Sequence, residues 1–188
     1  MNRIAFSGKM GAGKSSSCIL IHQEALGNAR KYSFAEKLKE MVGDLFGVDP
    51  YSKELDVRNK LQLVGSYMRE LDVDVWVKYL IRIINEDRFE SMYDGIQMID
   101  DLRYKNEFWA LKKEGFIIIR LDAPPEIRYN RMKHNLSWED FLEASKHPSE
   151  VDLDGVPDFE WDFKFDSSKS IEEMQNDIRV ALFRKEPL

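Results

Sequence analysis

The most informative segment of this sequence is Gly8-Lys9-Met10-Gly11-Ala12-Gly13-Lys14-Ser15, which matches the pattern G-x-x-x-x-G-K-[ST] at every position. It follows an apolar run, Ile4-Ala5-Phe6, that is typical of a short buried strand. After it, apolar residues recur at helical spacing over 14–26, and Gly27 predicts the end of that helix. A strand, a glycine-rich turn and a helix in this order form the context in which the pattern binds phosphate.

Each residue type in this motif has a physical role in holding a nucleoside triphosphate. Small residues let the backbone curl so that successive N–H groups point at phosphate oxygens, and the following helix adds its positive end. Lys14 is expected to reach the β- and γ-phosphates, and the Ser15 hydroxyl is placed to ligate Mg²⁺. The predicted ATP contacts are therefore Gly8, Gly11, Ala12, Gly13, Lys14, Ser15 and Ser16. For Ser16, and for Lys9, a solvated or capping role is an equal alternative.

The composition favours one ordered domain and argues against several classes of protein. The chain has 188 residues, 43% of them hydrophobic, which is enough for a sizeable core. Its 28 Lys and Arg residues are outnumbered by 34 Asp and Glu residues, and the net charge of −6 argues against binding of bulk nucleic acid or an anionic membrane. Cys18 is the single cysteine, which excludes an intrachain disulfide. Since no apolar run is long enough to cross a bilayer, we expect a soluble, cytoplasmic protein.

Short apolar runs alternate with longer segments of helical period, which predicts a parallel sheet covered by helices on both faces. Strands are expected at 4–6, 29–32, 96–101 and 116–121, with a half-exposed strand at 161–165. Helices are expected at 14–26, 54–69, 74–87 and 104–114. Four more are expected to begin at the capping box of Ser33 and Glu36 and after Pro124, Ser137 and Ser170. The polar stretch 133–159 is the least regular, and we expect it to be mobile.

Two acidic residues, Asp100 and Asp101, stand at the carboxyl end of the third predicted strand. Ligands of α/β folds bind at this edge, where an Asp can hold Mg²⁺ or accept a proton from the attacking oxygen. The two side chains must point to opposite faces of a continuing strand, so we expect one of them to face the site. Arg103 follows two residues after Asp101 on the same side, and its guanidinium could bind a second anion. A solvated pair of acids at a strand end is the alternative.

The predicted helix at 54–69 carries a second aligned face beside its apolar stripe. Arg58, Gln62, Gly65 and Arg69 follow the spacing i, i+4, i+7, i+11, with a cation at each end. At about 1.5 Å per residue the two arginines lie roughly 16 Å apart, the scale of a mononucleotide. Since glycine inside a helix costs about 1 kcal/mol relative to alanine, Gly65 suggests the close approach of another group. Arginines that are merely solvated are the alternative.

Arg128 and Arg131 are three residues apart on the helix that follows Pro124, so they share one face. In phosphoryl transfer, cations on a moving segment close over the γ-phosphate and neutralise its charge. A pair of surface arginines that balances Glu126 is the alternative.

Together these residues resemble the bacteriophage-type deoxynucleoside monophosphate kinases, a branch of the P-loop nucleoside monophosphate kinases. The resemblance runs in order through most of the chain. It includes the segment 8–15, Ser33-Phe-Ala-Glu-Lys37-Leu-Lys39, Arg58-x3-Gln62-x2-Gly65-x3-Arg69, Asp72-x3-Trp76-Val77, Asp101-Leu-Arg103-x2-Asn106-Glu107 and His147-Pro-Ser-Glu150-x2-Leu153-Asp154. The first motif is shared by a very large superfamily, and the later motifs point to this particular family.

The resemblance implies a three-layer P-loop fold whose five-stranded parallel sheet has the order 2-3-1-4-5. It implies one kinase domain over 1–188, with an acceptor-binding helical insertion at about 34–90 and a lid at about 124–158. The residues that it implies are Lys14 and Ser15 for ATP, Asp101 rather than Asp100 for metal or acceptor handling, Arg69 and Arg103 with Arg58 and Gln62 for the acceptor, and Arg128 and Arg131 for the lid. Tyr104-Lys105 and Asp100 depart from the family pattern, and His147 and Glu150 receive no role.

The sequence therefore predicts a kinase that uses ATP and Mg²⁺ to phosphorylate a (deoxy)nucleoside 5′-monophosphate, with Lys14, Asp101, Arg128 and Arg131 as catalytic residues. The expected partners are small-molecule substrates, and a homodimer is left open. One alternative is a P-loop kinase for another small acceptor, such as dephospho-coenzyme A. Another is a nucleotide-binding regulatory ATPase or switch with a protein partner. Which base is bound, and whether the sugar must be deoxy, does not follow from these residues.

Overall fold

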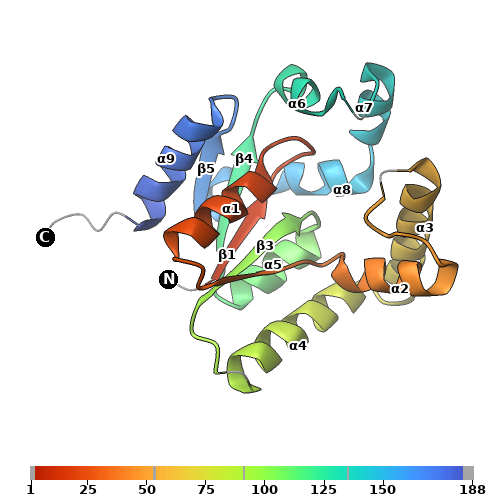
Figure 1. Cartoon of the computed structure of the whole chain (residues 1–188), viewed down its shortest axis with the longest axis horizontal. Helices are drawn as coiled ribbons and strands as arrows, with labels where there is room; N and C mark the ends of the chain where they lie inside the picture. Colours follow the sequence, from red (N-terminus) through yellow and green to blue (C-terminus); the bar gives the residue numbers. More distant parts are fainter. Residues whose placement is uncertain (1–2, 53, 91, 135, 184–188) are drawn as a thin grey trace, which may run out of the picture. The chain divides into compact units, whose positions relative to one another are not determined.

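The computed structural model of the protein describes residues 3–52, 54–90, 92–134 and 136–183. Within these residues, five strands form one sheet in the order β2-β3-β1-β4-β5 (Figure 1). The strands are β1 (Arg3–Ser7), β2 (Ala29–Tyr32), β3 (Ile96–Leu102), β4 (Ile117–Asp122) and β5 (Phe163–Asp166). The pairs β1–β3, β1–β4 and β4–β5 are parallel. The predicted α/β class and the sheet order 2-3-1-4-5 are confirmed.

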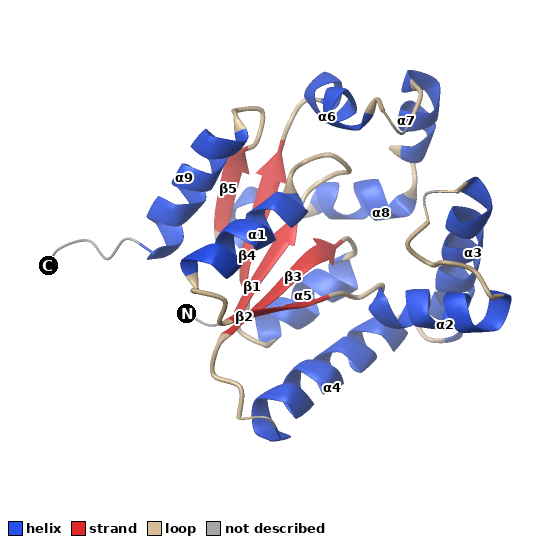
Figure 2. Ribbon diagram, viewed as in Figure 1, coloured by secondary structure: helices blue, strands red, loops and turns tan. Residues whose placement is uncertain are grey.

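Helices cover both faces of the sheet, as the alternation of strands and helices predicts. Helices α1 (Lys14–Glu24) and α9 (Ile171–Phe183) contact each other and the sheet. Figure 2 shows α1 in front of the sheet and α5 (Lys105–Lys113) behind it. The other described helices are α2 (Glu36–Phe46), α3 (Leu55–Leu71), α4 (Val75–Glu90), α6 (Pro125–Met132), α7 (Trp138–Ala144) and α8 (Pro148–Val151), with 3₁₀ turns η1 (Asp152–Gly155) and η2 (Asp158–Glu160).

The core forms on both sides of β1 because successive side chains of a strand point to opposite faces. Ile4 and Phe6 are fully buried in the cluster that includes residues of α1 and α9. Ala5 points the other way and is fully buried too, as are Phe108 and Leu111 of α5. Burial on both faces is typical of parallel sheets. It places the carboxyl ends of β1 and β3, which lead into the candidate site, on a packed scaffold.

The chain divides into two compact units. The first consists of Met1–Lys31 with Gly95–Leu188, and its described part contains the glycine-rich turn, α1 and α5 to α9. The second is Tyr32–Asp94, which contains α2, α3 and α4. The second unit spans the stretch expected to be an acceptor-binding insertion, and that function stays a prediction.

Two local expectations differ from the structure. Ser33 does not cap α2, which begins at Glu36 after Ala35; the Ser33 hydroxyl instead accepts the backbone N–H of Ala35 within the preceding turn. The described part of the stretch 133–159 is more regular than expected, because α7, α8 and η1 fall within it and η2 begins in it. Its apolar residues explain this order, since Phe141 is fully buried and Leu153 is nearly so. Ser137 caps α7 as predicted.

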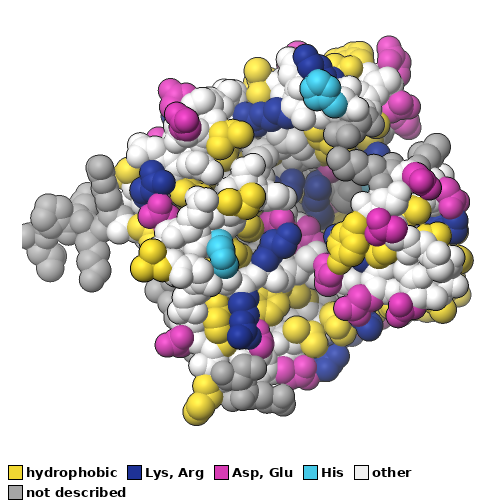
Figure 3. All heavy atoms as spheres, in the orientation of Figure 1, with side chains coloured by type: hydrophobic (Ala, Val, Ile, Leu, Met, Phe, Trp, Pro, Cys, Tyr) yellow, Lys and Arg dark blue, Asp and Glu magenta, His cyan; other side chains and the backbone are white. Residues whose placement is uncertain are grey.

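The surface is mixed in charge. On the face shown in Figure 3, Lys and Arg side chains are interspersed with Asp and Glu side chains. Among the described residues, every helix is too short or too polar to span a membrane.

Candidate functional site

The phosphate loop, residues 8–15, connects β1 to α1, and two of its glycines are required by close packing. Gly8 has a φ of +148° and Gly11 a φ of +79°. A Cβ on Gly8 would lie 2.5 Å from the carbonyl oxygen of Leu121, and one on Gly11 would lie 2.7 Å from that of Arg128. Both distances are too short for a carbon and an oxygen. The loop is therefore held against the end of β4 and against α6.

Substituting Gly11 with alanine is expected to lower the free energy of unfolding by about 2 kcal/mol more than substituting Gly115 does. Both glycines have positive φ, +79° and +74°, so each variant carries a similar backbone strain of about 1 kcal/mol. Among the described residues beyond its chain neighbours, a Cβ on Gly115 would meet no atom within 4 Å, whereas one on Gly11 meets the Arg128 backbone. Urea denaturation of both variants measures the difference, and equal losses would contradict the packing argument.

Lys14 begins α1, and its side chain is buried within the phosphate loop. Its Nζ donates hydrogen bonds to the carbonyl oxygens of Gly8 at 2.6 Å and Lys9 at 3.1 Å. Burial, and then the nearby guanidinium of Arg103, lower the pKa of Lys14 to about 7. Three carboxylates oppose this shift, those of Glu150, Asp100 and Asp101. A phosphate in the loop would supply the close anionic partner that the two carbonyls do not.

Ser15 and Asp100 form a pair of oxygen ligands suited to a divalent cation. The Ser15 Oγ donates to Oδ2 of Asp100 at 3.0 Å, and Lys31 Nζ lies 3.5 Å from the same oxygen. Asp100 is 9% exposed. Hydroxyl and carboxylate oxygens are hard ligands, and Mg²⁺ in nucleotide sites commonly takes one or two protein oxygens beside phosphates and water. The residues therefore fit a magnesium ion bound together with a nucleotide.

The structure adds Asp100 to the site that the sequence assigned to Asp101. Strand β3 continues through both residues, but its pairing with β1 shifts register between Ile99 and Leu102, so the strict alternation that the sequence predicts is interrupted there. Asp100 contacts Ser15, whereas the family pattern that includes Asp101, Arg103 and Asn106 favours Asp101. The charge of Asp101 also acts on Lys14. Its role as a metal or acceptor residue remains a prediction.

Arg103 lies at the carboxyl end of β3, where it forms an ion pair with Glu150. The second carboxylate oxygen of Glu150 accepts the backbone N–H of Met10, in the phosphate loop, at 2.6 Å. The predicted acceptor arginine is thus joined to the phosphate loop through a carboxylate. The motif that contains Glu150 assigns it no role, because its partners are distant in the chain.

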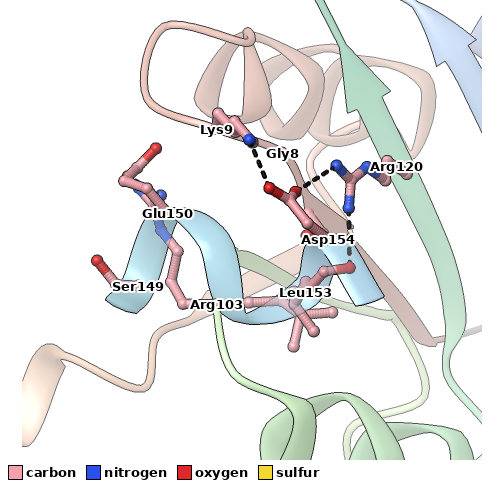
Figure 4. Close-up of a pocket in the computed structure, with 10 residues that line it drawn as sticks. Gly8, Lys9, Arg103, Arg120, Ser149, Glu150, Leu153 and Asp154 are labelled. Carbon is pink, nitrogen blue, oxygen red and sulfur yellow. Dashed lines mark hydrogen bonds and ion pairs between the residues drawn. The ribbon is translucent and has the colours of Figure 1, made fainter. Parts of the chain in front are cut away.

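A second acidic residue of the same segment, Asp154, contacts the phosphate loop (Figure 4). Its carboxylate accepts from Lys9 Nζ at 2.7 Å and from Arg120 Nη2 at 3.0 Å, while Arg120 Nη1 donates to the carbonyl of Leu153 at 3.2 Å. These cations lower the pKa of Asp154 against the opposing effect of burial. The only signal in the sequence was the placement of Asp154 in the His147-to-Asp154 motif.

The two predicted lid arginines lie beside the phosphate loop and donate to backbone carbonyls. Arg128 is 4% exposed, and its guanidinium donates to the carbonyls of Ala123 at 3.1 Å and Met10 at 3.2 Å. Arg131 donates to the carbonyl of Gly11 at 3.2 Å, and to those of Ser167 and Lys169. In this state both arginines support the loop backbone, and their contact with a γ-phosphate remains a prediction.

The predicted acceptor face lies on α3, in the second unit. Arg58, Gln62 and Arg69 fall on one helical face, since α3 runs unbroken over Leu55–Leu71. The close approach expected at Gly65 is made by a side chain of the same unit. A Cβ on Gly65 would lie 3.0 Å from Cδ2 of Leu38, so the missing side chain is explained by the packing of α2 against α3. The contacts of the three polar residues with an acceptor remain a prediction.

Comparison with known proteins identifies the fold. No protein-family model matches the sequence, and no curated protein matches it significantly. The tunicamycin resistance protein of Deinococcus radiodurans has a similar structure, with a TM-score of 0.59, 14% identity, and coverage of 98% of this chain and 96% of that chain. A sugar kinase from a Janibacter species has a TM-score of 0.54 and 13% identity, with coverage of 96% of this chain and 93% of that chain. Shikimate kinase from Bacteroides thetaiotaomicron has a TM-score of 0.52 and 14% identity, with coverage of 96% of this chain and 98% of that chain.

Proposed function

We propose that this protein is a kinase that transfers the γ-phosphoryl group of ATP to the 5′-phosphate of a (deoxy)nucleoside monophosphate, in the presence of Mg²⁺. The observation that carries the proposal is the buried Lys14 in a glycine loop, with the Ser15–Asp100 pair and Arg103 around it. The fold shared with a sugar kinase and a shikimate kinase supports phosphoryl transfer to a small molecule. The nucleotide acceptor is supported by the sequence motifs alone.

On the donor side, the work of the protein is to position phosphates and to balance their charge. The loop amides and Lys14 would bind the β- and γ-phosphates, and ATP contacts would extend to Ala12, Gly13 and Ser16. Ser15 with Asp100 or Asp101 would hold Mg²⁺, which neutralises charge on the β- and γ-phosphate oxygens when it is bound. Arg128 and Arg131 would add positive charge beside the transferring group on reorientation from their carbonyl partners.

On the acceptor side, the arginines would bind the phosphate that receives the transferred group. Arg69 and Arg103 are the proposed phosphate ligands, because guanidinium groups bind phosphate through two parallel hydrogen bonds. Arg58 and Gln62 extend the same face of α3 and would contact the rest of the nucleotide. Holding both substrates in line accounts for most of the catalysis in reactions of this type.

A panel of acceptors tests this proposal in a coupled assay for ADP release. The panel contains deoxy- and ribonucleoside monophosphates, dephospho-coenzyme A, shikimate and a simple sugar. We expect acceleration by at least one monophosphate and only background rates with the other acceptors. Acceleration by shikimate or the sugar alone would replace the proposed acceptor and retain the kinase. Slow ATP hydrolysis that no acceptor accelerates would favour a regulatory ATPase.

Replacing Arg69 with alanine is expected to raise the KM for the monophosphate about 10-fold or more, since a charged hydrogen bond contributes about 1.5–3 kcal/mol. The KM for ATP should change less than about twofold, because ATP is assigned to the other unit. Arg82→Ala is the matched control: Arg82 lies on α4 of the same unit, its side chain is 58% exposed, and it pairs with Glu86. An unchanged acceptor KM in the Arg69 variant would remove that residue from the site.

A further inference from the structure

The carboxylate of Glu150 contacts the phosphate loop and the arginine beside it. Oε2 accepts the N–H of Met10 at 2.6 Å, and Oε1 pairs with the guanidinium of Arg103. Figure 4 shows the Arg103 side chain extending to Glu150, which comes from α8. Only 7% of the Glu150 side chain is exposed, against 25% of that of Arg103. A charge this buried needs close partners, and the loop amide and the guanidinium provide them.

These partners are the ones that a phosphate oxygen would use. A loop amide, a guanidinium and an ammonium group are the usual donors to transferred phosphates. Met10 supplies the amide and Arg103 the guanidinium. Lys14 supplies the ammonium, and the charge of Glu150 raises the pKa of Lys14 against the stronger effect of burial. The carboxylate therefore lies among groups that would otherwise face an anionic ligand.

The cavity beside Glu150 is small in this state. The cavity lined by Gly8, Lys9, Arg103, Glu150 and Asp154 has a volume of about 10 Å³. A volume of this size holds about one water molecule. A terminal phosphate that is to accept from the Met10 N–H must displace the Glu150 carboxylate, because that carboxylate already accepts this hydrogen bond.

The acidic segment, residues 148–155, has a second and more exposed contact with the loop. Asp154 pairs with Lys9 at 2.7 Å and with Arg120 at 3.0 Å, and its side chain is 41% exposed. Because exposed ion pairs are weak, this contact opposes displacement of the segment less than Glu150 does. Both contacts place a carboxylate against a hydrogen-bond donor of the loop, the Met10 N–H for Glu150 and the Lys9 ammonium for Asp154, so nucleotide phosphate and the acidic segment would compete for the same partners.

We infer that Glu150 is an internal counter-anion of the phosphate site: it occupies the terminal-phosphate position beside Met10 in the nucleotide-free protein, and ATP must expel it, which also releases Arg103 to bind the acceptor phosphate. The inference rests on the proposed function, since it takes the bound anion to be a nucleotide phosphate. Glu150 is a positioning residue in this scheme. It holds the guanidinium of Arg103 at the loop before the substrate arrives.

The test is the affinity of Glu150→Gln for ATP and for inorganic tripolyphosphate, measured without Mg²⁺ by isothermal titration calorimetry. Glutamine keeps the shape of the side chain and removes its charge. We expect both ligands to bind about 10-fold more tightly, which corresponds to about 1.4 kcal/mol. Asp152→Asn is the matched control, with the same change of charge in the same segment. Its carboxylate accepts the Lys105 N–H at 2.7 Å, outside the phosphate loop, so its affinities should stay at the wild-type value.

Thermal unfolding without ligand separates this role from a purely structural one. Glu150→Gln loses a buried ion pair, so its Tm should fall while its affinity rises; damage to the fold would lower both. Asp154→Asn should raise the affinity for both ligands by a smaller factor. If Glu150→Gln does not fold, the affinity of Asp154→Asn tests the inference in its place. Unchanged or weaker binding relative to Asp152→Asn would overturn the inference.

The failure of the inference and that of the proposed function give different results. A wild-type protein that binds ATP and phosphorylates a monophosphate, with no gain in Glu150→Gln, overturns the inference alone. If the wild type binds ATP and tripolyphosphate but transfers phosphate to no acceptor, the proposed kinase is overturned. The inference is then decided by whether Glu150→Gln binds the two ligands more tightly. Absence of binding in the wild type and in all variants overturns both.

Discussion

Replacing Lys14 with methionine is expected to reduce kcat/KM for phosphoryl transfer about 1,000-fold and, at pH 6, to raise the Tm. The first effect follows from removal of the positive charge closest to the phosphates, since loss of one such group costs about 100- to 1,000-fold. The second follows from the burial of Lys14, which lowers its pKa to about 7. Burying a charged ammonium group costs free energy, and methionine of similar length avoids that cost.

The pH dependence of this stability difference has a definite sign. In the unfolded chain Lys14 titrates near its ordinary pKa of 10.5, and in the folded protein near 7. Between these values the unfolded state binds more protons, so this group makes the wild type more stable as the pH rises. Below pH 7 Lys14 is charged in the folded and in the unfolded state, so the full free-energy cost of burying its charge applies. The advantage of Lys14→Met should therefore be largest at pH 6 and smaller at pH 9.

Thermal unfolding of both proteins at pH 6 and pH 9 measures this change. Lys113→Met is the control, because Lys113 is exposed on α5 of the same unit and its substitution should shift the Tm equally at both pH values. A Lys14→Met advantage that grows with pH would contradict the burial argument. A near-normal rate of transfer in this variant would overturn the assignment of the donor site.

The second large effect is expected for Asp100→Asn, which should lower kcat about 100-fold and raise the Mg²⁺ concentration needed for half-maximal rate. The Asp100 carboxylate accepts from Ser15 Oγ at 3.0 Å, so the two oxygens would share one metal ion. An amide keeps the shape but removes the charge that attracts the cation. Asp101→Asn makes the same change one residue later, where the Ser15 hydroxyl is bonded to Asp100 instead, and should lower kcat less than about 10-fold.

The Mg²⁺ dependence of the rate, measured for both variants, decides between these two carboxylates. A larger loss in Asp101→Asn would return the metal role to the residue that the family resemblance implies. Equal losses would indicate that both carboxylates act, one on the metal and one on the attacking oxygen. The Tm of each variant serves as the control for folding, because Asp100 also pairs with Lys31 at 3.5 Å.

The local parts of the site were predictable from the sequence because local geometry requires particular residues. The segment 8–15 predicted the loop, and the following spacing predicted α1. Apolar runs predicted the buried strands. The choice between Asp100 and Asp101 was not predictable, because alternation shows only that the two side chains diverge. Gly65 predicted the close approach of another group, but helical spacing does not reveal that this group is Leu38.

The pattern of residues along the chain was sufficient for the α/β class and the phosphate loop, because strands, helices and glycine turns depend on neighbours a few positions apart. The sheet order came from the resemblance and was confirmed by the strand pairing. The contacts of Glu150 became visible only in the folded chain. Met10 is 140 positions away from Glu150 and Arg103 is 47 positions away, and no spacing rule relates residues at such separations. Their meeting depends on how the connections return to the carboxyl edge of the sheet, which is set by packing of the whole unit.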